Sequence, residues 1–153
     1  MSTVRQRLED AGVTLPPAPK PIAAYVPAVR VGDLVFISGQ IPMLDGSLVA
    51  GPVPSVVGIE AAAAAARQCA VNALAVLADA VDGDLDRVRR IVRIGVFVAS
   101  DPGFHDQPRV ANGASELLVE AFGDAGRHVR AAVGSVGLPL GATVELEMLA
   151  EIR

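Results

Sequence analysis

Residues 130–147 of the chain read RAAVGSVGLPLGATVELE, in which two apolar segments flank a stretch that contains glycine and proline. This pattern is typical of a β-hairpin. The hairpin would carry the Arg130 guanidinium and the Glu145 carboxylate on rigid strands, which suits a site that holds a small polar ligand. A loop over residues 136–139 would place Arg130 opposite Glu145, whereas a loop one residue longer would send them to opposite faces. The pattern allows both registers.

The ordinary role of two such side chains on paired strands is a salt bridge. An exposed cross-strand ion pair is common and contributes only ~0.2–1 kcal/mol to stability. On chemistry alone, Arg130 and Glu145 are therefore better explained by a structural salt bridge than by a functional site.

The rest of the chain predicts a single α+β domain over residues 1–153, with one sheet covered on one face by two long helices. Residues 1–20 form an addition at its start, in which a short helix over 2–11 is followed by a proline-rich connector over 14–21. The expected strands are 22–30, 34–38 and 91–98, and the expected long helices are 59–80 and 110–122.

The composition narrows the class of protein. Hydrophobic residues make up 52% of the 153 residues, aromatic residues 3% and charged residues 20%, so the core is built from small aliphatic side chains and little polar cover remains. This balance favours an oligomer with apolar interfaces. The net charge of −4 and the pI near 5.1 make nucleic acid a poor electrostatic partner.

The sequence shows no targeting segment, membrane span or metal motif. The most apolar window, residues 61–81, is interrupted by polar and charged side chains, so we expect a cytoplasmic protein without a membrane partner. One cysteine and two histidines fit neither a disulfide framework nor a zinc site, and no metal is expected. Cys69 lies in an alanine-rich helical pattern and is expected to be a small buried hydrophobe.

Several motifs at long spacing resemble one known family. These are Tyr25, VFISGQIP at residues 35–42, Arg130, Leu-Pro at 138–139 and Glu-Leu-Glu at 145–147. Together they resemble the RidA/YjgF reactive-intermediate deaminase family, also called the endoribonuclease L-PSP family, over residues 20–152. Residues 112–115 and 126–130 are further similar to one bacterial branch. The resemblance implies a chorismate-mutase-like fold assembled as a homotrimer, with clefts between subunits.

The resemblance also implies roles for Arg130 and Glu145. Arg130 corresponds to the arginine that holds the substrate carboxylate, and Glu145 to the glutamate that acts on water. The implied reaction is the hydrolysis of an imine or enamine derived from an amino acid, such as 2-iminopropionate formed from 2-aminoacrylate, to ammonia and a 2-oxo acid. An arginine fork and a water beside a carboxylate are sufficient for this chemistry, so no cofactor is expected.

Four further residues match the substrate-binding cleft of the family. Tyr25 corresponds to the tyrosine that closes the cleft, Ser38 and Gly39 to the loop that lines its floor, and Asn112 to an asparagine near its mouth. Outside this resemblance, a tyrosine on an apolar strand packs in an interface, a glycine makes a turn or bulge, and an asparagine caps a helix.

The chain departs from the family in places that bear on substrate choice. Ala132 stands where the best-known deaminases have a cysteine, and the loop over residues 100–107 is longer. His128 lies in an alternating strand pattern, and the resemblance requires no histidine there, so no role in the site is expected for it.

The sequence thus predicts a homotrimeric imine/enamine deaminase. One alternative is a non-catalytic trimer that binds a small carboxylate through Arg130, with Glu145 as a salt-bridge partner. Another is a ribonuclease or translation inhibitor, which the acidic pI and the lack of a basic groove disfavour.

Overall fold

The structure is a computed structural model that describes residues 1–20 and 23–153. Its α-helices and strands, in chain order, are α1 (Val4–Asp10), β1 (Ala28–Val31), β2 (Leu34–Gln40), β3 (Met43–Leu44), β4 (Ser47–Leu48), α2 (Ile59–Ala80), β5 (Val88–Ala99), α3 (Gln107–Phe122), β6 (Val129–Ser135) and β7 (Val144–Ile152). Short 3₁₀ turns, η1 (Leu85–Arg87), η2 (Gly123–Gly126) and η3 (Pro139–Gly141), connect some of them.

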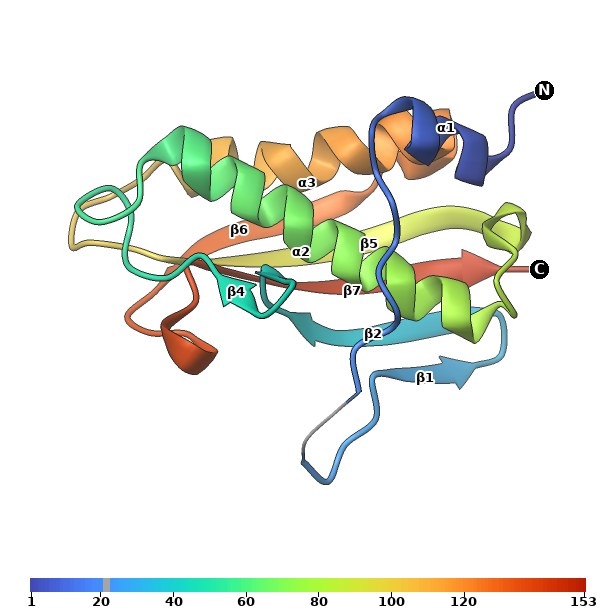
Figure 1. Cartoon of the computed structure of the whole chain (residues 1–153), viewed down its shortest axis with the longest axis horizontal. Helices are drawn as coiled ribbons and strands as arrows, with labels where there is room; N and C mark the ends of the chain where they lie inside the picture. Colours follow the sequence, from blue (N-terminus) through green and yellow to red (C-terminus); the bar gives the residue numbers. More distant parts are fainter. Residues whose placement is uncertain (21–22) are drawn as a thin grey trace.

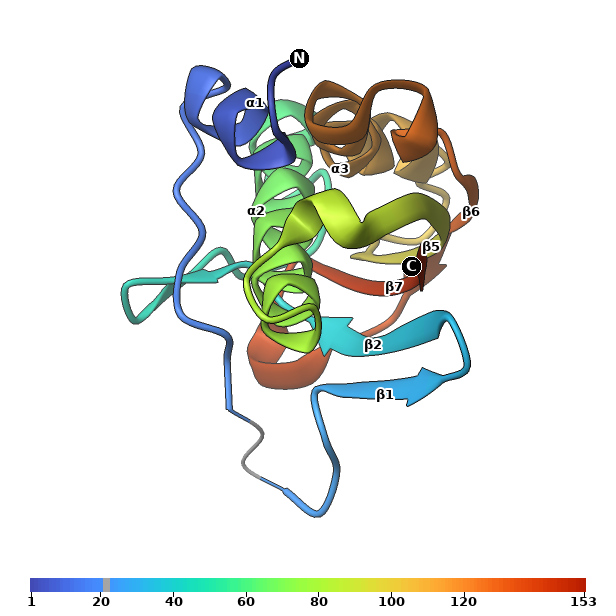
Figure 2. The same ribbon diagram turned by 90° about the vertical axis from the view of Figure 1, so that its right-hand side faces the viewer.

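Five strands form a mixed sheet in the order β1-β2-β7-β5-β6. Only the β5–β6 pair is parallel, and the other neighbours are antiparallel. Helices α2 and α3 lie side by side on one face of this sheet (Figures 1 and 2). The opposite face carries no element of this chain among the described residues, and we call it the open face. The predicted α+β fold with two helices on one face is confirmed.

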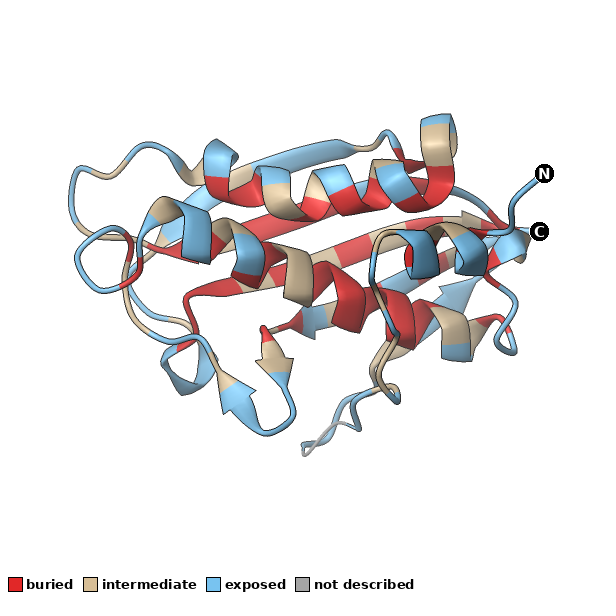
Figure 3. Cartoon of the chain, turned by 45° about the horizontal axis from the view of Figure 1, so that its top comes forward, coloured by how far each residue is buried: buried red, intermediate tan, exposed pale blue. Residues whose placement is uncertain are grey.

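The core lies between the two helices and the sheet. Burial is concentrated on the helix sides that are turned toward the strands (Figure 3). Near the start of α2 the two helices approach closely, since a methyl group at Gly113 of α3 would collide with the backbone of Ala63. Further along α2, Cys69 is fully buried, as predicted, and burial raises the pKa of its thiol. Small residues thus set the spacing of the helices.

The predicted hairpin of residues 130–136 and 143–147 is wrong. β5 lies between β6 and β7, so these two strands share no hydrogen-bonded register. β5 is the longest strand and consists largely of β-branched residues, and it pairs along both of its edges. The segment over residues 136–143 therefore passes across the end of β5, rather than closing a tight turn, and local turn residues do not distinguish these two outcomes.

The other elements lie close to their predicted positions. The helix predicted over 59–80 coincides with α2, and the short first helix begins at Val4 behind a Thr3 cap. The first strand begins at Ala28 rather than residue 22, which lies outside the described residues. A second, two-stranded sheet of β3 and β4 was not expected. The connector runs extended across α2 (Figure 1), with Leu15 and Ala18 packed against the core.

α2 is long and apolar enough to cross a membrane by length and composition alone. However, 67% of its most apolar window is buried inside the fold. This burial is typical of a core helix, and no other described helix meets the same criterion.

Candidate functional site

Glu145 lies on the open face of the sheet, against Gly39. Along β7, buried residues alternate with partly exposed ones, and Glu145 belongs to the partly exposed set. It is paired with Phe97 of β5 on one side, and its carboxylate lies over the Gly39 backbone of β2 on the other. A methyl group at Gly39 would collide with the Glu145 Oε1 atom. The glycine therefore makes the space that the carboxylate occupies.

A bulge in β2 produces this close approach. Between Ile37 and Gln40 the strand advances by three residues, while its partner β7 advances by two, from Met148 to Leu146. The extra residue falls at Ser38 and Gly39, and bulges of this kind redirect side chains beside functional sites. The segment that the resemblance assigned to the cleft floor is thus the irregular part of the strand.

Ser38 connects this bulge to the segment that carries Tyr25. Its hydroxyl donates to the Val26 carbonyl oxygen at 2.8 Å, and its backbone N–H donates to the Pro27 carbonyl oxygen at 2.9 Å. Tyr25 itself is 54% exposed. The structure therefore brings Tyr25, Ser38, Gly39 and Glu145 to one part of the molecule.

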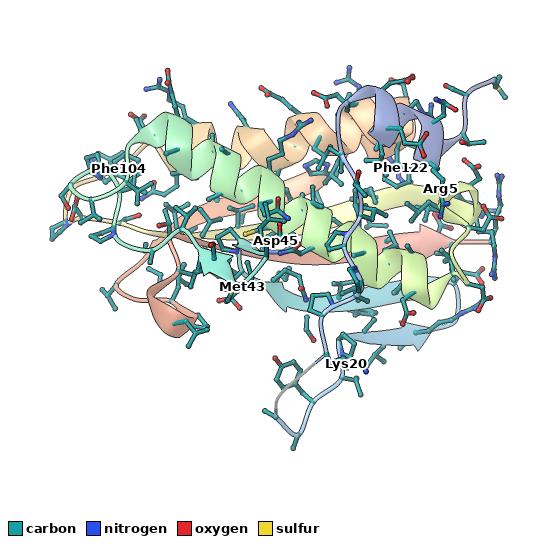
Figure 4. The ribbon with its side chains drawn as sticks, in the orientation of Figure 1. Arg5, Lys20, Met43, Asp45, Phe104 and Phe122 are labelled. Carbon is teal, nitrogen blue, oxygen red and sulfur yellow. The ribbon has the colours of Figure 1, made fainter. Side chains whose placement is uncertain are left out.

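A small cavity of about 140 Å³ opens beside Gly39. Lys20 and Met43, labelled in Figure 4, line it from the connector and from β3. The complete lining is Pro19, Lys20, Tyr25, Pro27, Gly39, Gln40, Ile41, Met43 and Asn72.

Asn72 of α2 supports this cavity and was missed by the sequence analysis. Its buried side-chain amide donates to the carbonyl oxygens of Ile41 at 2.9 Å and Met43 at 3.0 Å. Asparagine inside an otherwise apolar helix is the signal that could have identified it, because a buried amide needs partners. Asn72 therefore fixes the chain directly after the bulge.

The environment of Glu145 raises the pKa of its carboxyl. Burial is the larger cause, and the nearby negative charge of Glu147 acts in the same direction. Glu147 has its own partner, since its Oε1 atom lies 3.0 Å from the Arg93 Nη1 atom. Among the described residues, Glu145 makes no ion pair and no side-chain hydrogen bond. It is thus a carboxylate available to a ligand or to water.

Arg130 lies on the edge strand β6, two strands away from Glu145 on β7. Its Nη1 atom donates to the Ser115 hydroxyl at 3.0 Å, and its Nη2 atom donates to the Pro108 carbonyl oxygen at 3.3 Å. Both partners belong to α3. Asn112 lies between them in the sequence, and the helical repeat places positions 108, 112 and 115 on one side of the helix. Asn112 and Arg130 are therefore neighbours at the same edge.

Arg130 and Glu145 point away from each other within one chain. Arg130 is paired with Ile94, which is fully buried beneath the helices, whereas Glu145 is on the open face. Two strand spacings and three residues along the sheet separate them, which corresponds to about 14 Å between their Cα atoms. One chain cannot bring both side chains to one small ligand, so the predicted residues form two separate half-sites.

His128 and Arg130 bond to the same serine, although the sequence analysis expected no role in the site for His128. Its Nε2 atom lies 2.9 Å from the Ser115 hydroxyl oxygen, and its Nδ1 atom lies 2.6 Å from the Gly126 carbonyl oxygen. Burial lowers the pKa of this imidazole, the bond to Gly126 raises it, and the charge of Arg130 lowers it further. Ser115 is 13 residues before His128 in the sequence, and the fold brings it to His128 and Arg130.

The long loop over residues 100–107 is held in place by Gln107. Its side-chain amide donates to the Phe104 carbonyl oxygen at 2.8 Å and to the Ser100 hydroxyl at 3.3 Å. The loop ends where α3 begins, close in sequence to Pro108, which contacts Arg130. It is therefore an ordered part of the edge that carries Arg130.

Throughout residues 1–20 and 23–153, no group of three or more His, Cys, Asp or Glu side chains is placed to hold a metal ion.

Comparison with known proteins agrees with this fold. Residues 5–152 match the family described as "YjgF/chorismate_mutase-like, putative endoribonuclease". The chain belongs to this family, which includes imine deaminases as well as proteins named as endoribonucleases.

Three relatives illustrate the range of similarity. The chain is 42% identical over 152 residues to protein TCP17 of Trypanosoma cruzi, covering 98% of this chain and 94% of that protein. It is 30% identical to a 2-iminobutanoate/2-iminopropanoate deaminase of Dermatophagoides farinae, covering 92% and 95%. The crystal structure of Atu1372 from Agrobacterium tumefaciens, a protein of unknown function, has a TM-score of 0.93 at 44% identity, covering 98% and 92%.

Proposed function

We propose that the protein hydrolyses reactive imines and enamines derived from amino acids, releasing ammonia and a 2-oxo acid. The observation that carries this proposal is the Glu145 carboxylate, half-buried against Gly39 with a raised pKa and no ion-pair partner among the described residues. A relative named as a 2-iminobutanoate/2-iminopropanoate deaminase supports the choice of reaction.

Glu145 would act as the general base. A carboxylate with a raised pKa takes a proton from water more readily than an ordinary glutamate does. The hydroxide formed adds to the carbon of the protonated imine, and the proton on Glu145 then passes to the nitrogen of the tetrahedral adduct. As the C–N bond breaks and ammonia leaves, Glu145 takes the proton of the adduct's hydroxyl group, whose oxygen becomes the 2-oxo group, so one water is consumed for each ammonia released. An enamine such as 2-aminoacrylate first becomes the imine by protonation at carbon.

Arg130 would hold the substrate carboxylate. Its guanidinium is exposed, carries five N–H donors and uses two of them on α3, so three remain for a ligand. A planar fork of this kind fixes both oxygens of a carboxylate, which orients the adjacent imine carbon toward the attacking water.

The two half-sites require a second copy of the chain. We propose a homotrimer, as the family resemblance implies, in which the Glu145 half of one subunit faces the Arg130 half of its neighbour. Exposed apolar side chains on the open face support such contacts, because a monomer rarely leaves an apolar sheet face in water. They are Val29, Val31, Phe36, Val129 and Val133.

The test is the release of ammonia and 2-oxo acid from 2-aminoacrylate generated in place by a dehydratase. We expect wild-type protein to accelerate release, and Arg130→Ala to remove most of the acceleration by raising KM and lowering kcat/KM. Arg127→Ala is the matched control, since Arg127 is an exposed neighbour bonded to Asp124 rather than to α3. A folded wild-type protein without any acceleration would exclude deamination of this substrate and favour the carboxylate-binding alternative.

A further inference from the structure

We propose that Ser115 and His128 are positioning residues that hold the Arg130 guanidinium ready for a carboxylate. They do so through a chain of hydrogen bonds that runs in one direction, from Arg130 to the Gly126 carbonyl. The inference rests on the proposed function, because there Arg130 is the group that binds the substrate.

The direction of this chain follows from its two ends. The guanidinium can only donate hydrogen bonds and the Gly126 carbonyl can only accept them. Nδ1 of His128 lies 2.6 Å from that carbonyl oxygen and therefore carries the imidazole proton. Nε2 is then an acceptor for the Ser115 hydroxyl at 2.9 Å, and the Ser115 oxygen is left to accept from Arg130 at 3.0 Å. Every donor in the chain has one acceptor.

Each link determines the next one. A serine in a helix can rotate its hydroxyl toward the carbonyl of the preceding turn, which would withdraw its oxygen from Arg130. The Nε2 atom of His128 opposes this rotation by accepting a hydrogen bond from the hydroxyl group. Hydrogen bonds arranged in series also polarise one another, so the chain is stronger than its separate bonds.

The chain needs a neutral imidazole. Burial lowers the pKa of His128, the Gly126 bond opposes this shift, and Arg130 on β6 adds to it. In the adjacent turn Asp124 is bonded to Arg127 at 3.3 Å, and from α3 the contact is the uncharged Ser115. Protonation would turn Nε2 into a donor and add a second cation beside the guanidinium.

Both ends of the chain are fixed to the same helix. Arg130 reaches α3 at Ser115 and also at Pro108. At the other end, Gly126 lies so close to Leu118 of α3 that a methyl group would collide with the Leu118 backbone. Arg130 is therefore ordered when the chain folds, so that less side-chain freedom is lost when a ligand binds.

The first test needs neither a ligand nor turnover. We expect the ¹⁵N chemical shifts of His128 at pH 7 to report a neutral ring protonated at Nδ1. We also expect the Arg130 Nε–H group to be rigid in wild-type protein and mobile on the nanosecond timescale in Ser115→Ala. A ring protonated at Nε2, or an Arg130 equally mobile in both proteins, would overturn the inference whether or not the protein is a deaminase.

The second test measures what positioning does for binding. We expect Ser115→Ala to raise both KM and the Kd for 2-oxobutanoate about tenfold, with kcat within about twofold of wild type. Ser115→Thr keeps the hydroxyl and should restore most of the affinity. In an Arg130→Lys background, Ser115→Ala should change the Kd by less than about twofold, because the fork that it positions is gone.

A pair of histidine variants makes the test independent of the folding of Ser115→Ala. His128→Gln keeps an acceptor near the Nε2 position, whereas His128→Asn keeps only a donor near the Nδ1 position. We expect the Kd for 2-oxobutanoate to stay near wild type in the first variant and to rise about fivefold in the second. Equal affinity in both would overturn the inference. If the wild-type protein shows no turnover but the two histidine variants still differ in their Kd for 2-oxobutanoate, only the proposed function is overturned.

Discussion

The Glu145 carboxylate occupies space that exists only because residue 39 is glycine. The backbone of Gly39 makes no use of the left-handed region, so conformational freedom does not explain this glycine. A side chain at residue 39 and the observed position of Glu145 exclude each other. The identity of residue 39 is thus tied to the position of the carboxylate.

Replacing Gly39 should therefore impair activity although no reacting group is itself replaced. We expect Gly39→Ala to move Glu145 away from its present position and to lower kcat at least tenfold, because small displacements of a catalytic group are costly. The thermal midpoint should change little. Gly95→Ala is the matched control, since its methyl group would press on Glu147 instead. Equal losses of kcat in the two variants would contradict the assignment of Glu145.

Glu145→Gln should separate stability from activity. The pKa of Glu145 is raised in the folded state, so ionisation of this group opposes folding as the pH rises from about 4.5 through the folded pKa. We expect the variant to melt at a higher temperature than wild type at pH 7, and at the same temperature below the unfolded pKa. Its kcat should fall about 100-fold, the usual effect of losing a general base. A lower melting temperature at pH 7 would show that the carboxylate is stabilised by a partner.

The division of the site between subunits predicts complementation. Glu145→Gln and Arg130→Ala should each retain little activity, but trimers refolded from an equal mixture should regain about a quarter of wild-type turnover, because one site in four then combines two intact halves. Turnover is measured on the mixture and on each variant refolded alone. A mixture as inactive as its components would place both residues in a site formed by a single subunit.

Asn72→Ala should loosen the segment that follows the bulge. The change leaves the Ile41 and Met43 carbonyl oxygens without their donor, and we expect a loss of about 1–3 kcal/mol in the free energy of unfolding. Denaturant titration measures this loss. Gln68→Ala is the control, because Gln68 bonds only to the Asn72 side-chain oxygen and is partly exposed. An unchanged free energy of unfolding in Asn72→Ala would mean that water replaces the side-chain amide as the hydrogen-bond donor.

Local patterns predicted the elements well, but they predicted the pairing of the last two strands wrongly. The alanine-rich segment of α2 and the β-branched residues of β5 determine their own secondary structure, and both were predicted. Whether β6 pairs with β7 or with β5 depends on contacts between distant segments, and glycine and proline at 137–141 carry no information about them. The site residues divide in the same way. Glu145 and Arg130 were identified by motif, whereas the bonds of Asn72 to residues 41 and 43 and the bond of His128 to Ser115 depend on the fold.

The opposite orientation of Arg130 and Glu145 has a consequence for how the protein is assayed. If turnover requires both side chains at one ligand, a separate subunit can be fully folded and still have no activity. Specific activity would then fall on dilution, following the dissociation of subunits rather than their unfolding. Circular dichroism would stay constant over the same range of concentration. The enzyme concentration chosen for a rate measurement would therefore determine what fraction of the protein is active.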